Sequence, residues 1–314
     1  MNTELKNSVN ATDSKAQYDT SAKRLLGQKS ILAHILVKTV DEFKGTNPRD
    51  VVDYIEGTPH ISTVPVDPGL TNRTSETNGE RLVGLNTENE EIGEGLIRFD
   101  IVFYVRMRDG LSQIIINVEA QKDEPRGYEI LNRAIFYVSR LISSQKERDF
   151  ENSSYDDIKR VYSIWVCMNM DENSMSHVHL TKEDLIGSYK WKGNLDLLNI
   201  IMLGLAKELP EHDETYELHR LLGALLSQEL TIDEKLNIIG NEYDIPIEEN
   251  FRKDVSVMCN LSQGIEEKGI AIGEAGLIMK MYKNGFTAEQ IASATDKDIE
   301  EVKAIIAGKE PALA

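Results

Sequence analysis

Two carboxylates on neighbouring predicted strands are the residues of this chain best placed to do chemistry. They are Asp100 and Glu119, in the stretch RFDIVFYVRMRDGLSQIIINVEAQK from Arg98 to Lys122. The segments on either side of Asp109-Gly110 are rich in β-branched and aromatic residues, which favour strands. An Asp-Gly pair favours the two-residue turn of a hairpin. Such a turn places Asp100 directly opposite Glu119, with Cβ atoms roughly 4.5–5.5 Å apart.

The predicted register depends on the length of the turn. A four-residue loop centred on the same dipeptide gives the same pairing, whereas a three-residue bulged loop breaks it. Like charges directly opposite each other destabilise a hairpin, and a cation that both carboxylates bind removes that cost. Mg²⁺ prefers oxygen ligands and usually takes one or two protein carboxylates, so the pair predicts a Mg²⁺ site, with Mn²⁺ as a substitute. The plainer interpretation is that both acids are solvated residues near strand ends.

The two sides of the predicted hairpin differ in character. Side chains alternate across a strand, so Gln121 lies on the same side as Glu119. The other side carries the apolar residues of both strands, and we expect it to be core: Phe99, Ile101, Phe103, Val105, Ile114, Ile116, Val118 and Ala120.

The spacing of these residues is also that of a known motif. Asp100, followed on the next strand by Glu119-Ala120-Gln121, resembles the D…(D/E)xK signature of the PD-(D/E)XK nuclease superfamily. The wider sequence resembles the PD-(D/E)XK nuclease family transposases, which are related to recombination-promoting nucleases. The resemblance runs from about residue 25 to the C-terminus. Its strongest segments are VPVDPG (64–69), GLNTENEEIGEGLIRFDI (84–101), IINVEAQK (115–122), IFYVSRLISSQK (135–146) and VYSIWVCMN (161–169).

This resemblance implies a metal-dependent DNA endonuclease in which Asp100 and Glu119 hold Mg²⁺. It implies a restriction-endonuclease-like fold, an α/β core with a mixed sheet flanked by helices. Gln121 stands where the superfamily usually has a lysine. A glutamine supplies no positive charge, but it can orient an attacking water, and Lys122 is an alternative source of charge. The superfamily often has an acid on its first helix, which makes Glu42 a candidate third acid; a solvated helix residue is the plainer interpretation.

The elements after the hairpin fit such a core. Residues 127–148 have the apolar spacing of an amphipathic helix, and residues 160–169 resemble a buried strand. The order strand–strand–helix–strand fits a mixed sheet with a crossover helix. Three residues recur along one line of the helix and are candidate contacts to DNA phosphates, with packing against the sheet as the equal alternative: Arg133, Tyr137 and Arg140.

The pattern divides the chain into four segments. We expect a polar, disordered tail over residues 1–22 and the nuclease-like core over residues 23–190, with its first helix from Ser30 to Phe43. An all-helical C-terminal region follows. It comprises a helical extension over residues 191–246, with helices predicted at Leu195–Leu209 and Thr215–Glu229, and a last segment over residues 247–314.

The last segment combines a long, glycine-interrupted helix with a two-helix module over residues 285–307. Each short helix begins with the pattern of a capping box, Thr287 with Gln290 and Asp298 with Glu301. The pair resembles half of a helix-turn-helix, whose second helix enters the major groove. Acids stand at the start of that helix and repel phosphate, so we favour a structural or protein-contact module over a DNA reader.

Composition limits the class of protein. The net charge of −18 over 314 residues argues against a general nucleic-acid binder. Residues 98–160, however, carry 11 basic and 11 acidic residues, so the excess acid lies outside the predicted site. The sequence has no apolar run of membrane-spanning length and no apolar signal core, and its two cysteines suggest a reducing compartment. We therefore expect a cytoplasmic protein whose partner is DNA, with no membrane contact.

Two alternatives to an active nuclease remain open. One is a catalytically decayed nuclease fold that binds other proteins through its acidic helical C-terminus. The other is a DNA-binding regulator that acts through residues 285–307. The carboxylate pair favours the enzyme, because a decayed nuclease has no physical need to retain it. A homodimer would suit an enzyme that cuts both strands of a duplex.

Overall fold

The structure is a computed structural model that describes ten ranges of the chain: residues 20–61, 75–77, 80–82, 88–91, 95–98, 100–108, 113–121, 127–146, 149–150 and 152–307. The chain forms two compact units. The first is Ala22–Arg252, and the second contains Lys253–Ala314. None of the helices in the described ranges has the length and apolar character needed to cross a membrane.

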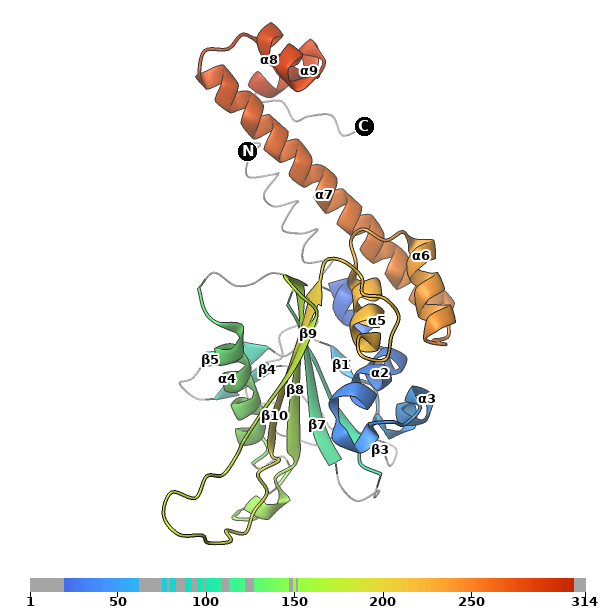
Figure 1. Cartoon of the computed structure of the whole chain (residues 1–314), viewed down its shortest axis with the longest axis vertical. Coiled ribbons are helices and arrows are strands. Elements are labelled where there is room, and N and C mark those ends of the chain that lie inside the picture. Colours follow the sequence, from blue (N-terminus) through green and yellow to red (C-terminus); the bar gives the residue numbers. More distant parts are fainter. Residues whose placement is uncertain are drawn as a thin grey trace. The chain divides into compact units, whose positions relative to one another are not determined.

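The first unit is built on a six-stranded mixed sheet in the order β1-β6-β7-β8-β10-β9 (Figure 1). Strands β7, β8 and β10 are parallel, whereas β1, β6 and β9 are each antiparallel to their neighbour. The strands are β1 (His60–Ile61), β6 (Ile101–Arg106), β7 (Gln113–Gln121), β8 (Arg160–Met170), β9 (Ser174–His179) and β10 (Leu198–Ala206). The prediction of an α/β core with a mixed sheet flanked by helices, and of helices at the C-terminus, is confirmed.

The central hairpin has the predicted register. Strands β6 and β7 pair from Ile101 opposite Val118 to Arg106 opposite Gln113. This is the pairing that a turn centred on Asp109-Gly110 produces. The turn itself lies outside the described residues, so its length stays a prediction.

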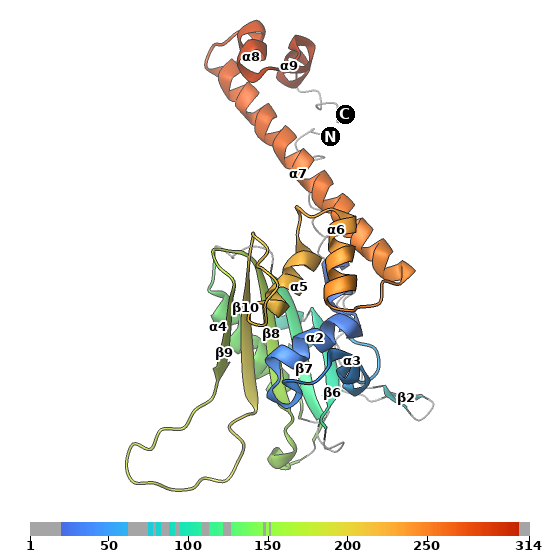
Figure 2. The same cartoon turned by 45° about the vertical axis from the view of Figure 1, so that its right-hand side comes forward.

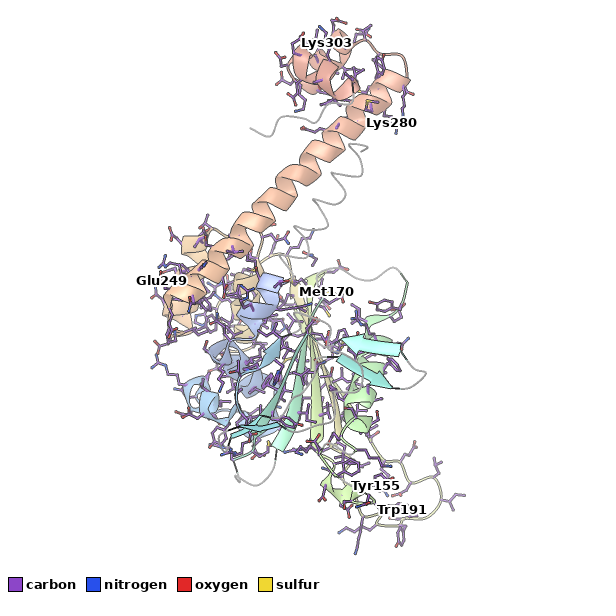
Figure 3. The ribbon with its side chains drawn as sticks, turned by 180° about the vertical axis from the view of Figure 1, so that it is seen from behind. Tyr155, Met170, Trp191, Glu249, Lys280 and Lys303 are labelled. Atoms are coloured by element: carbon purple, nitrogen blue, oxygen red, sulfur yellow. The ribbon has the colours of Figure 1, made fainter. Side chains whose placement is uncertain are left out.

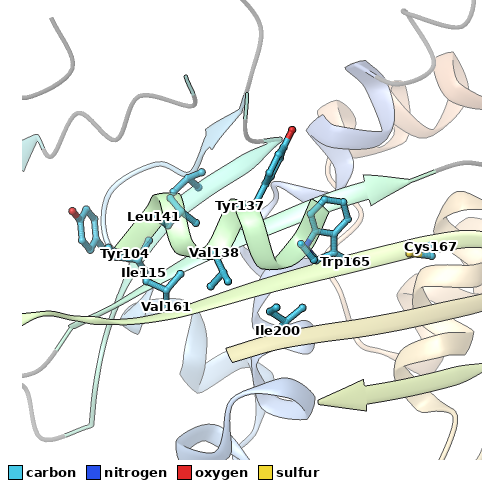
Figure 4. Close-up of a cluster of buried hydrophobic side chains, with 11 residues drawn as sticks. Tyr104, Ile115, Tyr137, Val138, Leu141, Val161, Trp165, Cys167 and Ile200 are labelled. Carbon is cyan, nitrogen blue, oxygen red and sulfur yellow. The ribbon is translucent and has the colours of Figure 1, made fainter. Parts of the chain in front are cut away.

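Helices cover both faces of the sheet (Figures 1 and 2). Helix α4 (Ile130–Ser143) connects the parallel strands β7 and β8 and packs on one face, while α2 (Lys29–Thr39) and α5 (Glu217–Leu226) lie on the other. The apolar side of the hairpin is core, as predicted, and Phe103 and Ile116 are buried there. The acidic side is core as well. Figure 4 shows α4 over side chains of β6, β7 and β8, in a cluster that includes Tyr104, Ile115, Val138, Leu141 and Trp165.

One predicted helix is a strand. The segment Leu195–Leu209 was expected to be helical, but Leu198–Ala206 forms β10, inserted between β8 and β9. A short apolar run has no periodicity that separates a buried helix from a strand buried on both faces. Its parallel pairing with β8, from Leu198 opposite Val161 onward, supplies the contacts that decide the outcome.

The remaining elements of the first unit agree with the sequence to within a few residues. Residues 20–26 are helical, so residues 20–22 do not belong to a disordered tail, and the rest of that predicted tail lies outside the described residues. Helix α6 begins with a capping box between Thr231 and Glu234. The shorter elements are η1 (Asp41–Phe43), α3 (Pro48–Val51), η2 (Val52–Tyr54), β2 (Ser75–Thr77), β3 (Glu80–Leu82), β4 (Glu88–Glu91), β5 (Gly95–Arg98), η3 (Tyr155–Asp157), α6 (Ile232–Asn237) and η4 (Ile238–Glu242).

The C-terminal elements are helical, as predicted: α7 (Glu249–Lys283), α8 (Ala288–Thr295) and α9 (Ile299–Ile306). The two short helices pack on the end of α7 around Ile278, Ile291, Val302 and Ile305. The capping box of Thr287 and Gln290 is confirmed. The second box is only half right. Asp298 caps α9 by accepting a hydrogen bond from the Glu300 backbone N–H, but Glu301 pairs with Lys297 instead of reaching back to the cap.

Candidate active site at the Asp100–Glu119 pair

The structure brings Asp100 and Glu119 together. The backbone N–H of Asp100 donates a hydrogen bond of 3.1 Å to Glu119 Oε1, and the backbone N–H of Ala120 donates one of 2.9 Å to Asp100 Oδ2. These bonds run from the backbone of one strand to the carboxylate of the other, just beyond Ile101, the first residue of β6. The predicted juxtaposition of the two carboxylates is therefore confirmed, and backbone donors hold both of them.

Burial changes the ionisation of Glu119 in this pair. Glu119 is only 3% exposed. Burial, and next the negative charge of Asp100, raise the pKa of Glu119 well above its usual range, while the backbone N–H of Asp100 opposes the shift. Two ionised carboxylates at this position are costly unless a cation lies beside them.

A cation from elsewhere in the chain does lie beside them. Lys23 Nζ is 2.8 Å from Asp100 Oδ1, and the two side chains are 14% and 15% exposed. Lys23 is in the helical segment over residues 20–26 and was not among the residues selected from the sequence. No local pattern marks it, because it lies next to the expected boundary of the tail and meets Asp100 only through the tertiary fold.

The other predicted site residues are Gln121, Lys122 and Glu42. Gln121 is the last residue of β7, two positions after Glu119, and is partly exposed. Lys122 lies outside the described residues. Glu42 is not a third acid of the pair. It accepts a hydrogen bond from the Arg108 backbone N–H, beyond the opposite end of β6 from Asp100, because α2 carries it along the sheet.

Helix α4 turns two residues of the predicted line of Arg133, Tyr137 and Arg140 toward the sheet. Tyr137 and Arg140 face the sheet, and Arg140 is only 4% exposed, while Leu131, Ile135 and Phe136 are exposed. The burial of Arg140 agrees with the packing alternative, and the phosphate contact predicted for it stays a prediction.

Arg133 is committed to aromatic partners. Its Nη1 donates to the Tyr128 hydroxyl and its Nη2 to the Tyr137 hydroxyl, both at 2.8 Å. The guanidinium also lies 4.8 Å from the centre of the Tyr137 ring and 5.5 Å from that of Trp165. Arg133 therefore helps to pack α4 against β8. The phosphate contact predicted for it stays a prediction.

The donor set fits a divalent cation that prefers oxygen ligands. Two carboxylates lie side by side, and an ammonium group already takes a position against one of them. Asn117 lies two positions before Glu119 on the same side of β7, and its buried Oδ1 has no hydrogen-bond partner in the described part of the chain. The described residues contain no group of three or more His, Cys, Asp or Glu side chains placed to hold a metal. A two-carboxylate site of this kind suits Mg²⁺, which keeps several waters.

Comparison with protein-family models, with curated proteins and with solved structures found no match to this chain.

Proposed function

We propose that this protein is a metal-dependent DNA endonuclease of the transposase-associated PD-(D/E)XK type, with a restriction-endonuclease-like core. The observation that carries the proposal is the contact between Asp100 and Glu119. Two acids opposed on a sheet are destabilising, and binding of a cation is the chemistry that makes such a pair useful. The ordered sequence segments that resemble this family, and the mixed sheet with helices on both faces, support the same conclusion.

The residues present divide the work in a definite way. Asp100 and Glu119 would hold Mg²⁺ or Mn²⁺, and the bound ion would supply a Lewis acid toward the phosphate and toward water. Glu119 is covered by the core, so substrate approaches from the more exposed side of Asp100. Gln121 positions the attacking water or the phosphate. Lys23 supplies the positive charge that Gln121 lacks, and Lys122 is a second candidate for that role.

The contact between Lys23 and Asp100 favours a second candidate function as well. A lysine that compensates the acid pair allows the fold to persist without metal, as an interaction protein that has lost activity. The DNA-regulator alternative is weaker. The exposed start of α9 carries Asp298 and Glu300, and the neighbouring Lys297 and Lys303 are ion-paired with carboxylates.

Cleavage of supercoiled plasmid separates the two leading functions. The wild-type protein is incubated with Mg²⁺ or Mn²⁺ and compared with Asp100→Asn and with wild type plus EDTA. The proposal predicts nicked or linear product in the first reaction and none in the two controls. A folded wild-type protein that leaves the plasmid intact at every metal concentration would favour the interaction protein.

A further inference from the structure

The loop that joins β9 to β10 exposes large apolar side chains that the described residues of the first unit leave uncovered. We refer to residues 180–197 as the arm. Ile186 is 98% exposed, Leu185 85%, Trp191 76% and Tyr189 67%. Figure 3 shows Trp191 at the far end of the sheet from Met170, the last residue of β8. An apolar patch of this kind on a soluble protein marks a binding surface.

Charge within the arm narrows the kind of partner. Tyr189, Lys190, Trp191 and Lys192 alternate ring and ammonium, and the two rings are 4.8 Å apart at an angle of 68°. Both lysines are exposed, and neither contacts a carboxylate within the described part of the chain. Lys182 differs, because it is ion-paired with Asp184 and also donates to the Tyr189 carbonyl.

We propose that the arm binds single-stranded DNA. Aromatic rings form platforms on which bases stack, and adjacent lysines contact the phosphates between those bases. Leu185 and Ile186 lie in the same loop and are suited to wedge between neighbouring bases. An uncharged protein or lipid surface would cover the apolar residues equally well, but it would make no use of the two exposed ammonium groups, of which Lys190 lies between the rings and Lys192 follows them.

The arm also has exposed groups suited to bind DNA, whereas the predicted DNA contacts beside the candidate active site are engaged within the fold. Two of the α4 residues predicted to contact DNA make contacts within the fold instead. Arg133 is hydrogen-bonded to two tyrosines, and Arg140 is buried. The base of the arm belongs to the same sheet. Leu198 pairs with Val161, four residues or about 13 Å along β8 from the partner of Glu119. Binding by the arm does not require the proposed nuclease activity.

The test is fluorescence anisotropy of a labelled oligothymidine in EDTA, which excludes metal-dependent cleavage. The variants are Tyr189→Ala/Trp191→Ala, Lys190→Gln/Lys192→Gln and, as a matched control in the same arm, Lys182→Gln. We expect the aromatic pair to weaken binding by at least about tenfold. The lysine pair should flatten the dependence of log Kd on log salt by about 1.4, or 0.7 for each lost phosphate contact. Lys182→Gln should leave binding within about twofold, because the removed charge is already paired.

The outcomes separate this inference from the nuclease proposal. Because EDTA excludes cleavage, binding of the oligothymidine by the wild type is measured whether or not the protein cuts DNA. No binding by the wild type, or equal binding by the wild type and the aromatic variant, would overturn the inference. Binding to phosphatidylserine vesicles, or self-association in sedimentation, that is lost only in the aromatic variant would assign the arm to a membrane or to a second copy. Thermal melting should be unchanged for all three variants, since the side chains are exposed.

Discussion

The two ends of the central sheet differ in which side chains they bury and which they expose. At the end that carries Asp100 and Glu119, charged groups are buried, and backbone N–H groups and Lys23 satisfy them. At the end that carries the arm, apolar and aromatic groups are exposed. At the first end, two carboxylates lie together with one ammonium group, and we propose that a metal ion balances the remaining charge. At the second end, we propose that another molecule covers the exposed side chains, so that the two proposals place chemistry and binding at different ends of the sheet.

Alanine substitutions at the two tryptophans test this contrast, and they have the largest expected effect on the free energy of unfolding. Trp165 is 1% exposed, and its indole N–H donates to Ser163 Oγ at 2.9 Å. Trp165→Ala should therefore lower the free energy of unfolding by about 3–5 kcal/mol. Trp191→Ala should change it by less than about 0.5 kcal/mol, because the side chain packs little within the fold. Urea denaturation measures both, and comparable losses would show that the arm is part of the core.

Removal of one ligand of the acid pair is expected to abolish chemistry without unfolding the protein. Asp100→Asn should reduce plasmid cleavage by at least about 100-fold, since even the outer partners of metal ligands are worth about 10–100-fold. The matched control is Asp171→Asn, an exposed aspartate in the turn between β8 and β9. Both variants should melt within a few degrees of wild type. Full cleavage by Asp100→Asn would remove the pair from the mechanism.

The buried carboxyl group of Glu119 makes the stability of the fold depend on pH. Its pKa is raised in the folded state, so the folded protein holds a proton that the unfolded chain releases. Stability therefore falls as pH rises from the usual glutamate range to the folded pKa, by about 1.4 kcal/mol for each unit of pKa difference.

Glu119→Gln should remove this dependence. In EDTA, the variant should melt above wild type at pH 8, and the difference should vanish below about pH 4, where the glutamate is neutral in both states. A difference that is independent of pH, or a less stable variant at pH 8, would show that the carboxylate is not strained by its surroundings.

Lys23 provides the smallest and most specific test. Its ammonium is paired with Asp100 Oδ1 and would compete there with a metal ion bound at the proposed site. Lys23→Met should tighten Mn²⁺ binding by up to about fivefold, because an ion pair of this kind is worth up to about 1 kcal/mol. The charge control is Lys44→Met, whose exposed ammonium pairs with Asp41 away from the site. Weaker Mn²⁺ binding by Lys23→Met would mean that the lysine supports the metal site rather than competing with it.

Local signals predicted the central hairpin, and they failed where the tertiary structure decides. The register of β6 and β7 follows from one turn dipeptide and the alternation of side chains, both of which are local. The α2, α4 and C-terminal helices were predicted from spacing and caps in the same way. The juxtaposition of Asp100 and Glu119 could therefore be predicted from the sequence.

The errors share one cause. Leu198–Ala206 became a strand because β8 and β9 offer it partners. Lys23 reaches Asp100, and Glu42 does not, because of the path that the N-terminal helices take along the sheet. The exposure of Trp191 and Tyr189 also depends on which surfaces the fold leaves uncovered, and their sequence pattern was not selected in advance.

Calorimetric titration of Mn²⁺ into the protein tests the central claim most directly. The wild type is compared with the double variant Asp100→Asn/Glu119→Gln, which keeps the shape of both side chains and removes both charges. The account predicts one site in the wild type, displaced by Mg²⁺, and no binding by the folded double variant. Equal Mn²⁺ binding by the two proteins, or no binding by the wild type, would contradict a metal site at this pair.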